Sequence, residues 1–396
     1  MPAGARIAVL VAPLALAAGL GGAAQGSAPA AVQAAFALRS YAPGDPATLR
    51  FDGSAAGVRV AIFRAGWGRD GVLQGARVTA ERTVAARGPL RLRLGTWPSG
   101  LYYARVVTPG LGTWDAPFVL RPARLGANRI AIVLPTNTWQ AYNDEGGDSW
   151  YFDSSVTHVD LARPYLDAGV PPHYRGYDRG FVRWLALNHV AADFLSDDDL
   201  DALDGEQLAR AYDLVVFSGH DEYVTGREFD TTERYRDLGG NLAFLSANDF
   251  FYKVEKRGST MTGRRRWRDL GRPEAALVGE QYVDWNHDRY PNRPFRVTGA
   301  RRAPWLFAGT GLSDGSAFGV YGIEVDAVAP SSPPGTEVLA RIAGIFGPGV
   351  SAEMTYYSTP RGAKVFSAGV MNFGGSSLWP PVRTMVANLI RHLSEP

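Results

Sequence analysis

Apolar and polar positions follow two different patterns along this chain, and the first covers residues 35–122. There, short runs alternate apolar with polar residues; Leu90 and Leu92, for example, flank Arg91. A period of two is typical of a strand with one buried face. The runs are "FALRS", "ATLRF", "VRVAIFRA", "RVTAERTV", "LRLRLG", "GLYYARVVT" and "APFVLR". They predict a small antiparallel β-sandwich of immunoglobulin type over residues 35–122.

The second pattern begins near residue 127 and consists of nearly continuous apolar runs. They are "RIAIVLP" (129–135), "DLVVFSG" (213–219), "NLAFLSA" (241–247) and "KVFSAGV" (364–370). Such runs are typical of strands covered on both faces. Helix-like segments separate them: "GFVRWLALNHVAADFL", "DDDLDALDGEQLARAY" and "TTERYRDLGG". The alternation predicts a doubly wound α/β domain with a mainly parallel sheet over residues 127–396. We expect "PWLFAG", "GVYGIEV" and "EMTYYST" to form an added β layer.

Residues 1–30 have the features of a secretory signal peptide. Arg6 provides the positive region, "IAVLVAPLALAAGL" the apolar region, and "GGAAQGSAPA" small-residue cleavage sites. The apolar run is short for a membrane span and is interrupted by Pro13. We therefore expect a secreted or extracytoplasmic protein without stable membrane insertion.

Composition narrows the chemistry. The chain has no cysteine, which excludes disulfides, a cysteine nucleophile and thiolate metal ligands. Its 41 basic and 39 acidic residues give a formal net charge of +2, so nothing in the charge favours a nucleic-acid partner.

Polar residues follow each predicted buried strand. In such a sheet, ligands bind outside the carboxyl ends of the strands. The residues that come next are Thr136, Asn137, Trp139, Tyr142 and Asn143 after the first strand, His220, Asp221 and Glu222 after the second, Asn248 and Asp249 after the third, and Asn372 and Phe373 after the last. We expect these loops to converge on one active site.

Two local spacings suggest which side chains meet. In extended chain, His220 and Glu222 point to the same side, with Asp221 pointing away. The alternative is that His220 bonds locally and Glu222 caps the following helix. Tyr142 and Tyr151 lie on either side of a glycine-containing turn, where they could face each other or serve only as packing groups.

The motifs "TWQAYN…GGDSWY", "SGHDEY", "GGNLAFLSAN" and "GVMNFGG" occur in this order. Together they resemble the catalytic domain of the N,N-dimethylformamidase large (beta) subunit over roughly residues 127–396. The preceding β domain also resembles one carried by secreted relatives of that subunit. The fold class expected with this resemblance is α/β, doubly wound and class I amidotransferase-like, preceded by a small all-β sandwich.

The resemblance implies a mononuclear iron(III) site. Tyr142 and Tyr151 would be phenolate ligands and Glu222 the carboxylate ligand. The catalytic residues would be His220, Asn248 and Glu324, and the substrate pocket would include Asn143 and Phe373. A phenol titrates near ~10, so it ionises at neutral pH only beside strong positive charge, which a trivalent hard cation supplies. The implied function is a secreted metal-dependent hydrolase of an amide C–N bond.

Other functions and partners stay open. One alternative is a non-catalytic binding or carbohydrate-associated module, and another is a metal-free hydrolase in which Glu222 acts with Asp221 or Glu324. Trp150 and Val224 depart from the pattern of the family, so we do not transfer dimethylformamide as the substrate. The partner expected is a small-molecule amide; a homo-oligomer is left open. The small companion subunit of dimethylformamidase is not in this chain, and nothing in the sequence predicts one.

Overall fold

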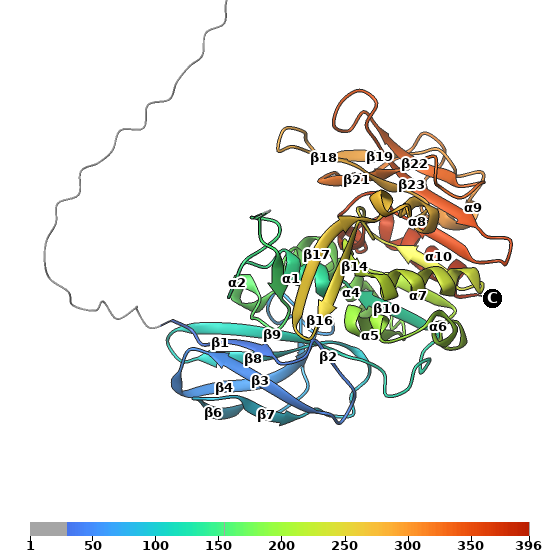
Figure 1. The fold of residues 1–396 in the computed structure, drawn as a ribbon. Coiled ribbons are helices and arrows are strands. Elements are labelled where there is room, and N and C mark those ends of the chain that lie inside the picture. The colour runs from blue at the N-terminus through green and yellow to red at the C-terminus, as the bar shows by residue number, and fades with distance from the viewer. Residues whose placement is uncertain (1–29, 154, 396) are drawn as a thin grey trace, which may run out of the picture.

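The computed structural model describes residues 30–153 and 155–395. An antiparallel β domain comes first, and an α/β domain follows it (Figure 1). The predicted signal peptide falls almost wholly within residues 1–29, outside the described residues, and stays a prediction. Among the described residues, no helix is both long and apolar enough to cross a membrane.

The β domain contains two antiparallel sheets, as the alternating pattern predicted. Its strands are β1 (Gln33–Phe36), β2 (Ser40–Tyr41), β3 (Pro46–Asp52), β4 (Ala55–Arg64), β5 (Ala76–Arg77), β6 (Arg82–Ala86), β7 (Leu90–Arg93), β8 (Gly100–Thr108) and β9 (Gly112–Leu120). One sheet has the order β1-β3-β7; the other has the order β2-β9-β8-β4-β5, with β6 also paired to β4. Only β2 and β9 pair in parallel. The predicted run "RVTAERTV" is divided between β5 and β6.

The larger sheet of the β domain is buried on both faces. Val60 and Ile62 of β4 pack into the core between the two sheets. Ala61 and Phe63, which alternate with them, belong instead to the core that includes Phe181 and Trp184 of the α/β domain. Alternate residues of β4 therefore enter two different cores, and the core that contains Ala61 and Phe63 is shared with the α/β domain.

The α/β domain is organised around a nine-stranded sheet. Its order is β12 (Asp193–Ser196), β10 (Ile130–Leu134), β13 (Leu214–Phe217), β15 (Asn241–Phe244), β24 (Lys364–Ser367), β23 (Ser351–Ser358), β22 (Glu337–Ala343), β19 (Arg293–Val297) and β20 (Ala317–Tyr321). The first five strands are parallel. The last four continue the same sheet antiparallel. The prediction of a parallel sheet thus holds for the strands recognised from continuous apolar runs.

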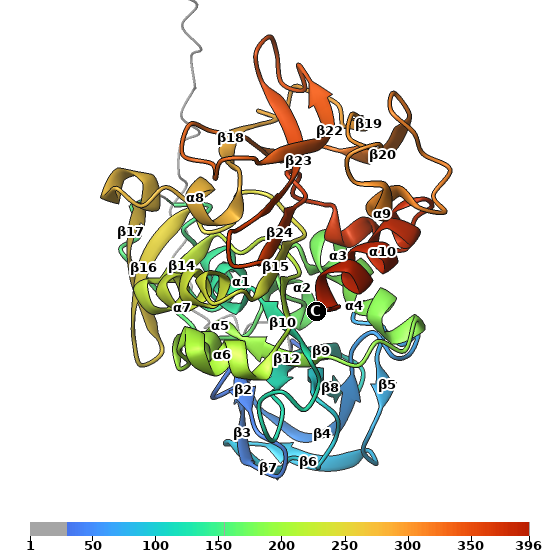
Figure 2. The same cartoon turned by 90° about the vertical axis from the view of Figure 1, so that its right-hand side faces the viewer.

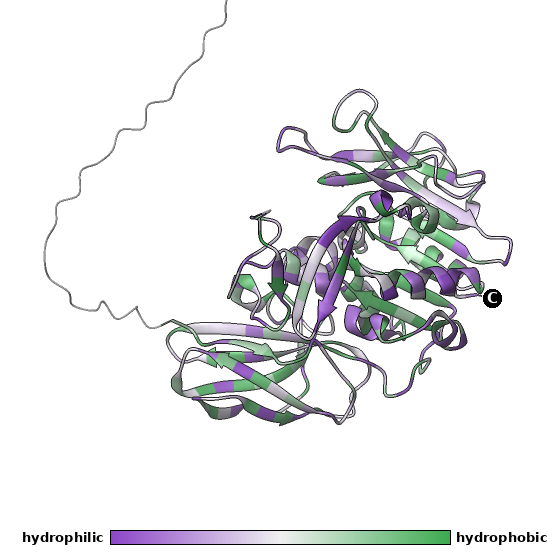
Figure 3. Cartoon of the chain, in the orientation of Figure 1, coloured by the Kyte–Doolittle hydropathy of each residue, from purple (hydrophilic) through white to green (hydrophobic). Residues whose placement is uncertain are grey.

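Helices cover both faces of the parallel part (Figure 2). The helices of the α/β domain are α1 (Thr136–Ala141), α2 (Leu166–Gly169), α3 (Tyr174–Tyr177), α4 (Arg179–Leu187), α5 (Asp197–Asp201), α6 (Gly205–Ala211), α7 (Gly226–Asp237), α8 (Ala275–Val278), α9 (Pro304–Phe307) and α10 (Val382–Ser394), with 3-10 turns η1 (Trp267–Leu270) and η2 (Gly374–Ser376). Val216 packs toward α4 and α10, whereas Val215 and Phe217 pack toward α6 and α7. Because alternate residues enter two cores, the strand is apolar throughout. Figure 3 shows the resulting hydrophobic central strands and the hydrophilic α7.

Three local predictions were wrong. "PWLFAG" forms the short helix α9 rather than a strand, with Pro304 at the first helical position, where its missing N–H has no consequence. "GFVRWLALNHVAADFL" is not one helix: α4 ends at Leu187 and β12 begins at Asp193. "EMTYYST" lies almost wholly within β23, which extends the main sheet instead of forming a separate layer. "GVYGIEV" is divided between β20 of the main sheet and β21 (Glu324–Ala327), which belongs to a separate two-stranded sheet, so the added layer is present only in part.

Two small sheets lie beside the main one. The first has the order β11 (His158–Asp160), β17 (Thr260–Arg266), β16 (Tyr252–Arg257) and β14 (Tyr223–Thr225). The second pairs β18 (Gln281–Trp285) with β21 (Glu324–Ala327). A β-bridge between Val325 and Val370 holds β21 next to the segment that follows β24.

Candidate functional site

The segments after the parallel strands meet at one edge of the sheet, as the sequence predicted. Tyr142 ends α1, the helix that follows β10. His220 and Glu222 lie between β13 and β14, and Asn248 lies after β15. Glu324 begins β21 above the same edge. All five side chains are buried or half-buried.

Tyr142, His220 and Glu222 form a triangle of direct contacts. Tyr142 Oη donates to Glu222 Oε2 at 2.8 Å and lies 3.2 Å from His220 Nε2. The same Nε2 atom is 3.2 Å from Glu222 Oε2. His220 and Glu222 therefore do share one side of an extended segment, as their spacing predicted. All three residues are less than one-tenth exposed.

His220 is suited to hold a proton at this triangle. Its Nδ1 lies 3.0 Å from the carbonyl oxygen of Ala247, which can only accept, so Nδ1 carries a hydrogen. Burial alone lowers the pKa of His220, but the contact with Glu222 and the charge of Glu324 outweigh it and raise the pKa to about 9. The imidazolium then donates from both nitrogens, to Ala247 and to the Tyr142–Glu222 pair.

The backbone of the segment is held by α1. The Thr138 hydroxyl accepts the N–H groups of Glu222 at 3.0 Å and of Tyr223 at 3.3 Å. The alternative in which Glu222 caps the next helix is wrong, because Thr225 caps α7 in a reciprocal arrangement with Glu228. Glu222 is consequently free to face Tyr142.

Tyr142 stays protonated in this setting. Burial, together with the charges of Glu222 and Glu324, raises the pKa of its hydroxyl well above the ordinary value. Its phenolate form therefore requires a strong positive charge nearby.

Tyr151 stacks on Tyr142. Their ring centroids are 4.9 Å apart and the rings are inclined by 24°. Tyr151 is 58% exposed, so it lies at the solvent side of Tyr142, next to Phe152. The two tyrosines thus face each other across the loop, and only Tyr142 contacts Glu222 in a hydrogen bond.

Asn248 and Glu324 form a second pair at the site. Asn248 Nδ2 donates to Glu324 Oε2 at 2.7 Å, and the backbone N–H of Asn248 is 2.9 Å from both carboxylate oxygens of Asp326. Asn248 Oδ1 is buried without a partner. Burial, with the charge of Glu222 adding to it and His220 opposing it, raises the pKa of Glu324 to about 7.

A small pocket adjoins Tyr142 and His220 and contains residues that the sequence did not single out. Its lining includes His173, Tyr177 and Asp178. His173 stacks on Tyr177 with centroids 5.1 Å apart. Burial, followed by the charge of His220, lowers the pKa of His173 to about 4, so it is neutral.

Asp178 is the polar group at the floor of this pocket. It accepts from Trp139 Nε1 at 3.4 Å, while its Oδ1 is buried without a partner. Burial raises its pKa to about 7. A Cβ atom on Gly219 would lie 2.1 Å from Asp178 Oδ1, so a larger residue at position 219 would clash with this carboxyl. In the sequence, the one indication of this close approach is that Gly219 directly precedes His220.

Asn143 and Phe373, predicted for the substrate pocket, have other contacts. Asn143 Nδ2 donates to Gln140 Oε1 and to the Pro164 carbonyl, and its Oδ1 accepts the N–H of Leu166. Phe373 is buried and packs near Tyr321 and Phe366. Neither is bonded to the Tyr142–His220–Glu222 triangle.

The donors at the triangle match what a hard cation binds. In residues 30–153 and 155–395, no group of three or more His, Asp or Glu side chains is arranged to hold a metal ion, so the predicted set depends on phenol oxygens. Two oxygens bound in adjacent positions at ~2.0–2.2 Å from one ion lie roughly 3 Å apart. The 2.8 Å between Tyr142 Oη and Glu222 Oε2 fits this spacing.

Sequence comparison finds similarity to beta subunits of N,N-dimethylformamidase. The chain is 25% identical over 304 residues to an N,N-dimethylformamidase beta subunit of Paracoccus aminophilus, and 24% identical over 304 residues to one of an Alcaligenes species. Each match covers 60% of this chain and 40% of the relative, so the matched region is less than half of those proteins.

Comparison with solved structures finds matches at low sequence identity, of which the following is one. A superoxide reductase (neelaredoxin) from Ignicoccus hospitalis matches 23% of this chain and 80% of its own, at 13% identity and a TM-score of 0.17. That score is too low to support an argument.

The family described as N,N-dimethylformamidase beta subunit-like, C-terminal, matches residues 81–378. The match includes Tyr142, His220 and Glu222 as well as Asn248 and Glu324. This chain belongs to the N,N-dimethylformamidase beta subunit-like family.

Proposed function

We propose that this chain hydrolyses the C–N bond of a small-molecule amide, with mononuclear iron(III) held by Tyr142, Tyr151 and Glu222. The observation that carries the proposal is the contact between Tyr142 Oη and Glu222 Oε2 beside His220, at the carboxyl edge of the parallel strands. Membership of an amide hydrolase family supports the reaction class.

The chain's own residues would prepare the site for the ion. When bound, iron(III) supplies a Lewis acid that polarises a carbonyl group and lowers the pKa of water. Tyr142 and Glu222 are already in contact, and Tyr151 is stacked on Tyr142 at the solvent side. Thr138 holds the backbone on which Glu222 is carried.

His220 and Glu324 would handle the protons. Loss of an amine from an amide requires a proton at the leaving nitrogen. His220 carries one at Nε2, which faces Tyr142 and Glu222. Glu324, with a pKa of about 7, exchanges a proton near neutral pH. Asn248 Oδ1, which has no hydrogen-bond partner among the described residues, would accept an N–H of the substrate.

A metal-free hydrolase is the second candidate, favoured by one specific observation. Burial raises the pKa of Glu324 to about 7, with the charge of Glu222 adding to the effect, which suits a general acid paired with a second carboxylate. The two candidates differ in their response to a chelator: only the carboxylate pair would keep its activity.

We also propose a fold type and boundaries for each domain, and export of the protein. The α/β domain would be class I amidotransferase-like and the β domain immunoglobulin-like, with boundaries at 127–396 and 35–122. Residues 1–30 would be removed on export, giving a secreted protein. N-terminal sequencing of the exported protein tests the last point, because a signal peptide leaves a new first residue.

Metal analysis and the visible spectrum of the purified protein test the ligand set. We expect stoichiometric iron and a phenolate-to-iron charge-transfer band, with both lost or altered in Tyr142→Phe. Tyr174→Phe is the matched control, because Tyr174 is equally buried and its hydroxyl has no partner. Its spectrum should equal that of the unsubstituted protein.

A colourless protein that takes up no iron would contradict the proposal. Amide hydrolysis by that protein in the presence of a chelator would instead support the carboxylate pair. Binding without hydrolysis would support the non-catalytic module.

A further inference from the structure

Arg39 links the β domain to the candidate site. It lies between β1 and β2, is 9% exposed, and extends its guanidinium group into the α/β domain. Nε donates to Asp198 Oδ2 at 2.8 Å, Nη2 pairs with Asp198 Oδ1, and Nη1 donates to Asn137 Oδ1 at 2.9 Å. The fork of one guanidinium group thus bonds both α5 and α1.

Asn137 connects Arg39 to the segment that contains Glu222. It is fully buried, and its Nδ2 donates to the Tyr223 carbonyl at 3.0 Å. The next residue, Thr138, accepts the N–H groups of Glu222 and Tyr223. Asn137 and Thr138 therefore hold the peptide groups beside Glu222 through one carbonyl and two N–H groups.

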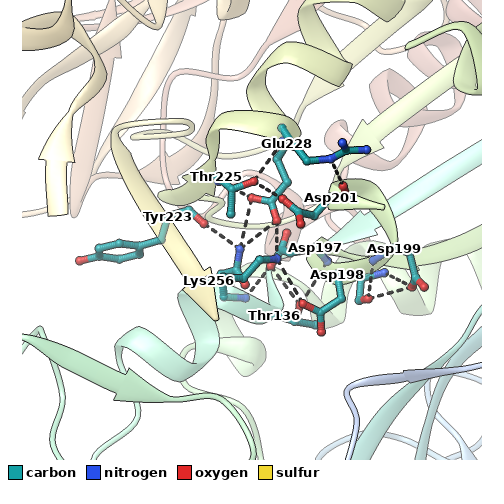
Figure 4. Close-up of polar contacts among 12 residues, drawn as sticks. Thr136, Asp197, Asp198, Asp199, Asp201, Tyr223, Thr225, Glu228 and Lys256 are labelled. Atoms are coloured by element: carbon teal, nitrogen blue, oxygen red, sulfur yellow. Dashed lines mark hydrogen bonds and ion pairs between the residues drawn. The ribbon is translucent and has the colours of Figure 1, made fainter. Parts of the chain in front are cut away.

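Opposite charges around Arg39 stabilise its contacts with Asp198 and Asn137. Lys256 Nζ lies 2.7 Å from Glu228 Oε1 and 3.2 Å from Asp198 Oδ1, and Figure 4 shows Lys256 among these carboxylates, near Tyr223. Arg39 and Lys256 together neutralise Asp198 and Glu228. Arg39 is the one cation of this pair that comes from the β domain.

We propose that Arg39 is a positioning residue: through Asn137 it holds Glu222 and His220 in contact with Tyr142, so the β domain forms part of the site. The consequence for iron and catalysis rests on the proposed function, whereas the effect on the geometry of His220 does not.

The test compares Arg39→Lys with the unsubstituted protein. Lysine keeps a positive charge beside Asp198 but lacks the planar fork that also reaches Asn137. The first readout is the ring NMR signal of His220 in the metal-free protein, assigned with His220→Asn. We expect this signal to move or broaden while the melting temperature stays close to that of the unsubstituted protein. The second readout is iron affinity, expected to fall roughly 10- to 100-fold.

Arg121→Met is the matched control. Arg121 also comes from the β-domain side and approaches α5, at 3.7 Å from Asp199, but makes no bond to Asn137. In Arg121→Met, the ring NMR signal of His220 should be unchanged. Asn137→Ala should shift the signal in the direction seen for Arg39→Lys, and the double variant should add little further change, because both act through one contact.

An unchanged His220 signal in Arg39→Lys, or a double variant whose changes simply add, would overturn the proposal. If Arg39→Lys does not fold, Asn137→Ala alone decides it, through the same signal. A protein that never binds iron would refute the proposed function but would leave the first readout intact.

Discussion

Two largely buried polar clusters of the α/β domain balance their charges differently. In the network of Arg39, Lys256, Asp197, Asp198 and Glu228, the positive charges belong to groups that stay protonated at every physiological pH. At the site, Glu222 pairs with His220, whose positive charge depends on a proton. The cations of the network are therefore fixed, whereas the positive charge at the site depends on a proton that can leave.

The pKa values follow this difference. Burial would raise the pKa of Asp198, but Arg39 and Lys256 outweigh it and lower the pKa to about 2. Asp197, deeper in the network, has its pKa raised to about 8 by burial and by Glu228, so it holds a proton and the two cations face two anions. At the site, Glu324 has a pKa of about 7 and His220 of about 9. At the site, protons balance the charge of the carboxylates, and these protons can be exchanged for a metal cation. In the network, arginine and lysine balance that charge and cannot be exchanged.

The largest expected effect comes from removing a fixed cation. Lys256→Met leaves Glu228, which is fully buried, without its ion-pair partner. Breaking a buried pair from one side costs about 3–5 kcal/mol of unfolding free energy. Urea unfolding measures it, with Lys253→Met as control: Lys253 pairs with Glu255 at the surface, where about 0–1 kcal/mol is expected. Equal losses in the two variants would contradict the comparison.

Gly219→Ala tests how tightly the site is packed. The new methyl group would lie 2.1 Å from Asp178 Oδ1, so this buried carboxyl would have to move. Overpacking of this kind costs about 1–3 kcal/mol. We expect a lower melting temperature and a displaced His220 NMR signal. Gly226→Ala is the control, since a Cβ there meets its nearest atom at 3.7 Å; a stability loss as large as that of Gly219→Ala would show that local crowding is not the cause.

Glu280 offers a third case, a buried carboxyl without any cation. It accepts from Thr355 Oγ1 at 3.0 Å, and burial followed by the charge of Asp326 raises its pKa well above the ordinary value of 4.5. The folded protein therefore binds a proton that the unfolded chain releases, so stability is full below pH 4.5 and declines as pH rises toward the folded-state pKa.

Glu280→Gln should remove that decline. We expect little change in stability at pH 4 and a gain at pH 8, about 1.4 kcal/mol for each unit by which the pKa of Glu280 is raised. Thermal unfolding across this pH range measures it. A variant that is less stable at pH 8 than the unsubstituted protein would mean that Glu280 is ionised and has a partner.

The smallest effect is expected for Asp198→Asn. Because the folded-state pKa of Asp198 is lowered to about 2, its ion pairs contribute stability above pH 3.8 and lose it as pH falls toward 2. The variant should be less stable at pH 7 and should show a shallower loss between pH 4 and pH 2. Asp198 is 45% exposed, so solvent screening keeps the effect modest. Parallel acid-unfolding curves for the two proteins would contradict the assignment.

Local pattern was enough for much of this architecture. A period of two predicts strands with one buried face, and continuous apolar runs predict strands covered on both faces; β10, β13, β15 and β24 are where the runs placed them. The same period placed His220 and Glu222 on one side of their segment, since adjacent side chains in extended backbone alternate.

Contacts between distant segments had no such signal. His173 and Asp178 lie in "PPHYRGYD", which has no recognisable spacing, yet both line the pocket beside His220. Arg39 is one arginine among many and meets Asn137 98 positions later. The sequence by itself determined which strands are buried and which loops carry polar groups, because backbone period and burial are local properties. The tertiary structure alone decided which of those groups touch and which cations balance which carboxylates, because packing brings together residues whose separation along the chain carries no pattern.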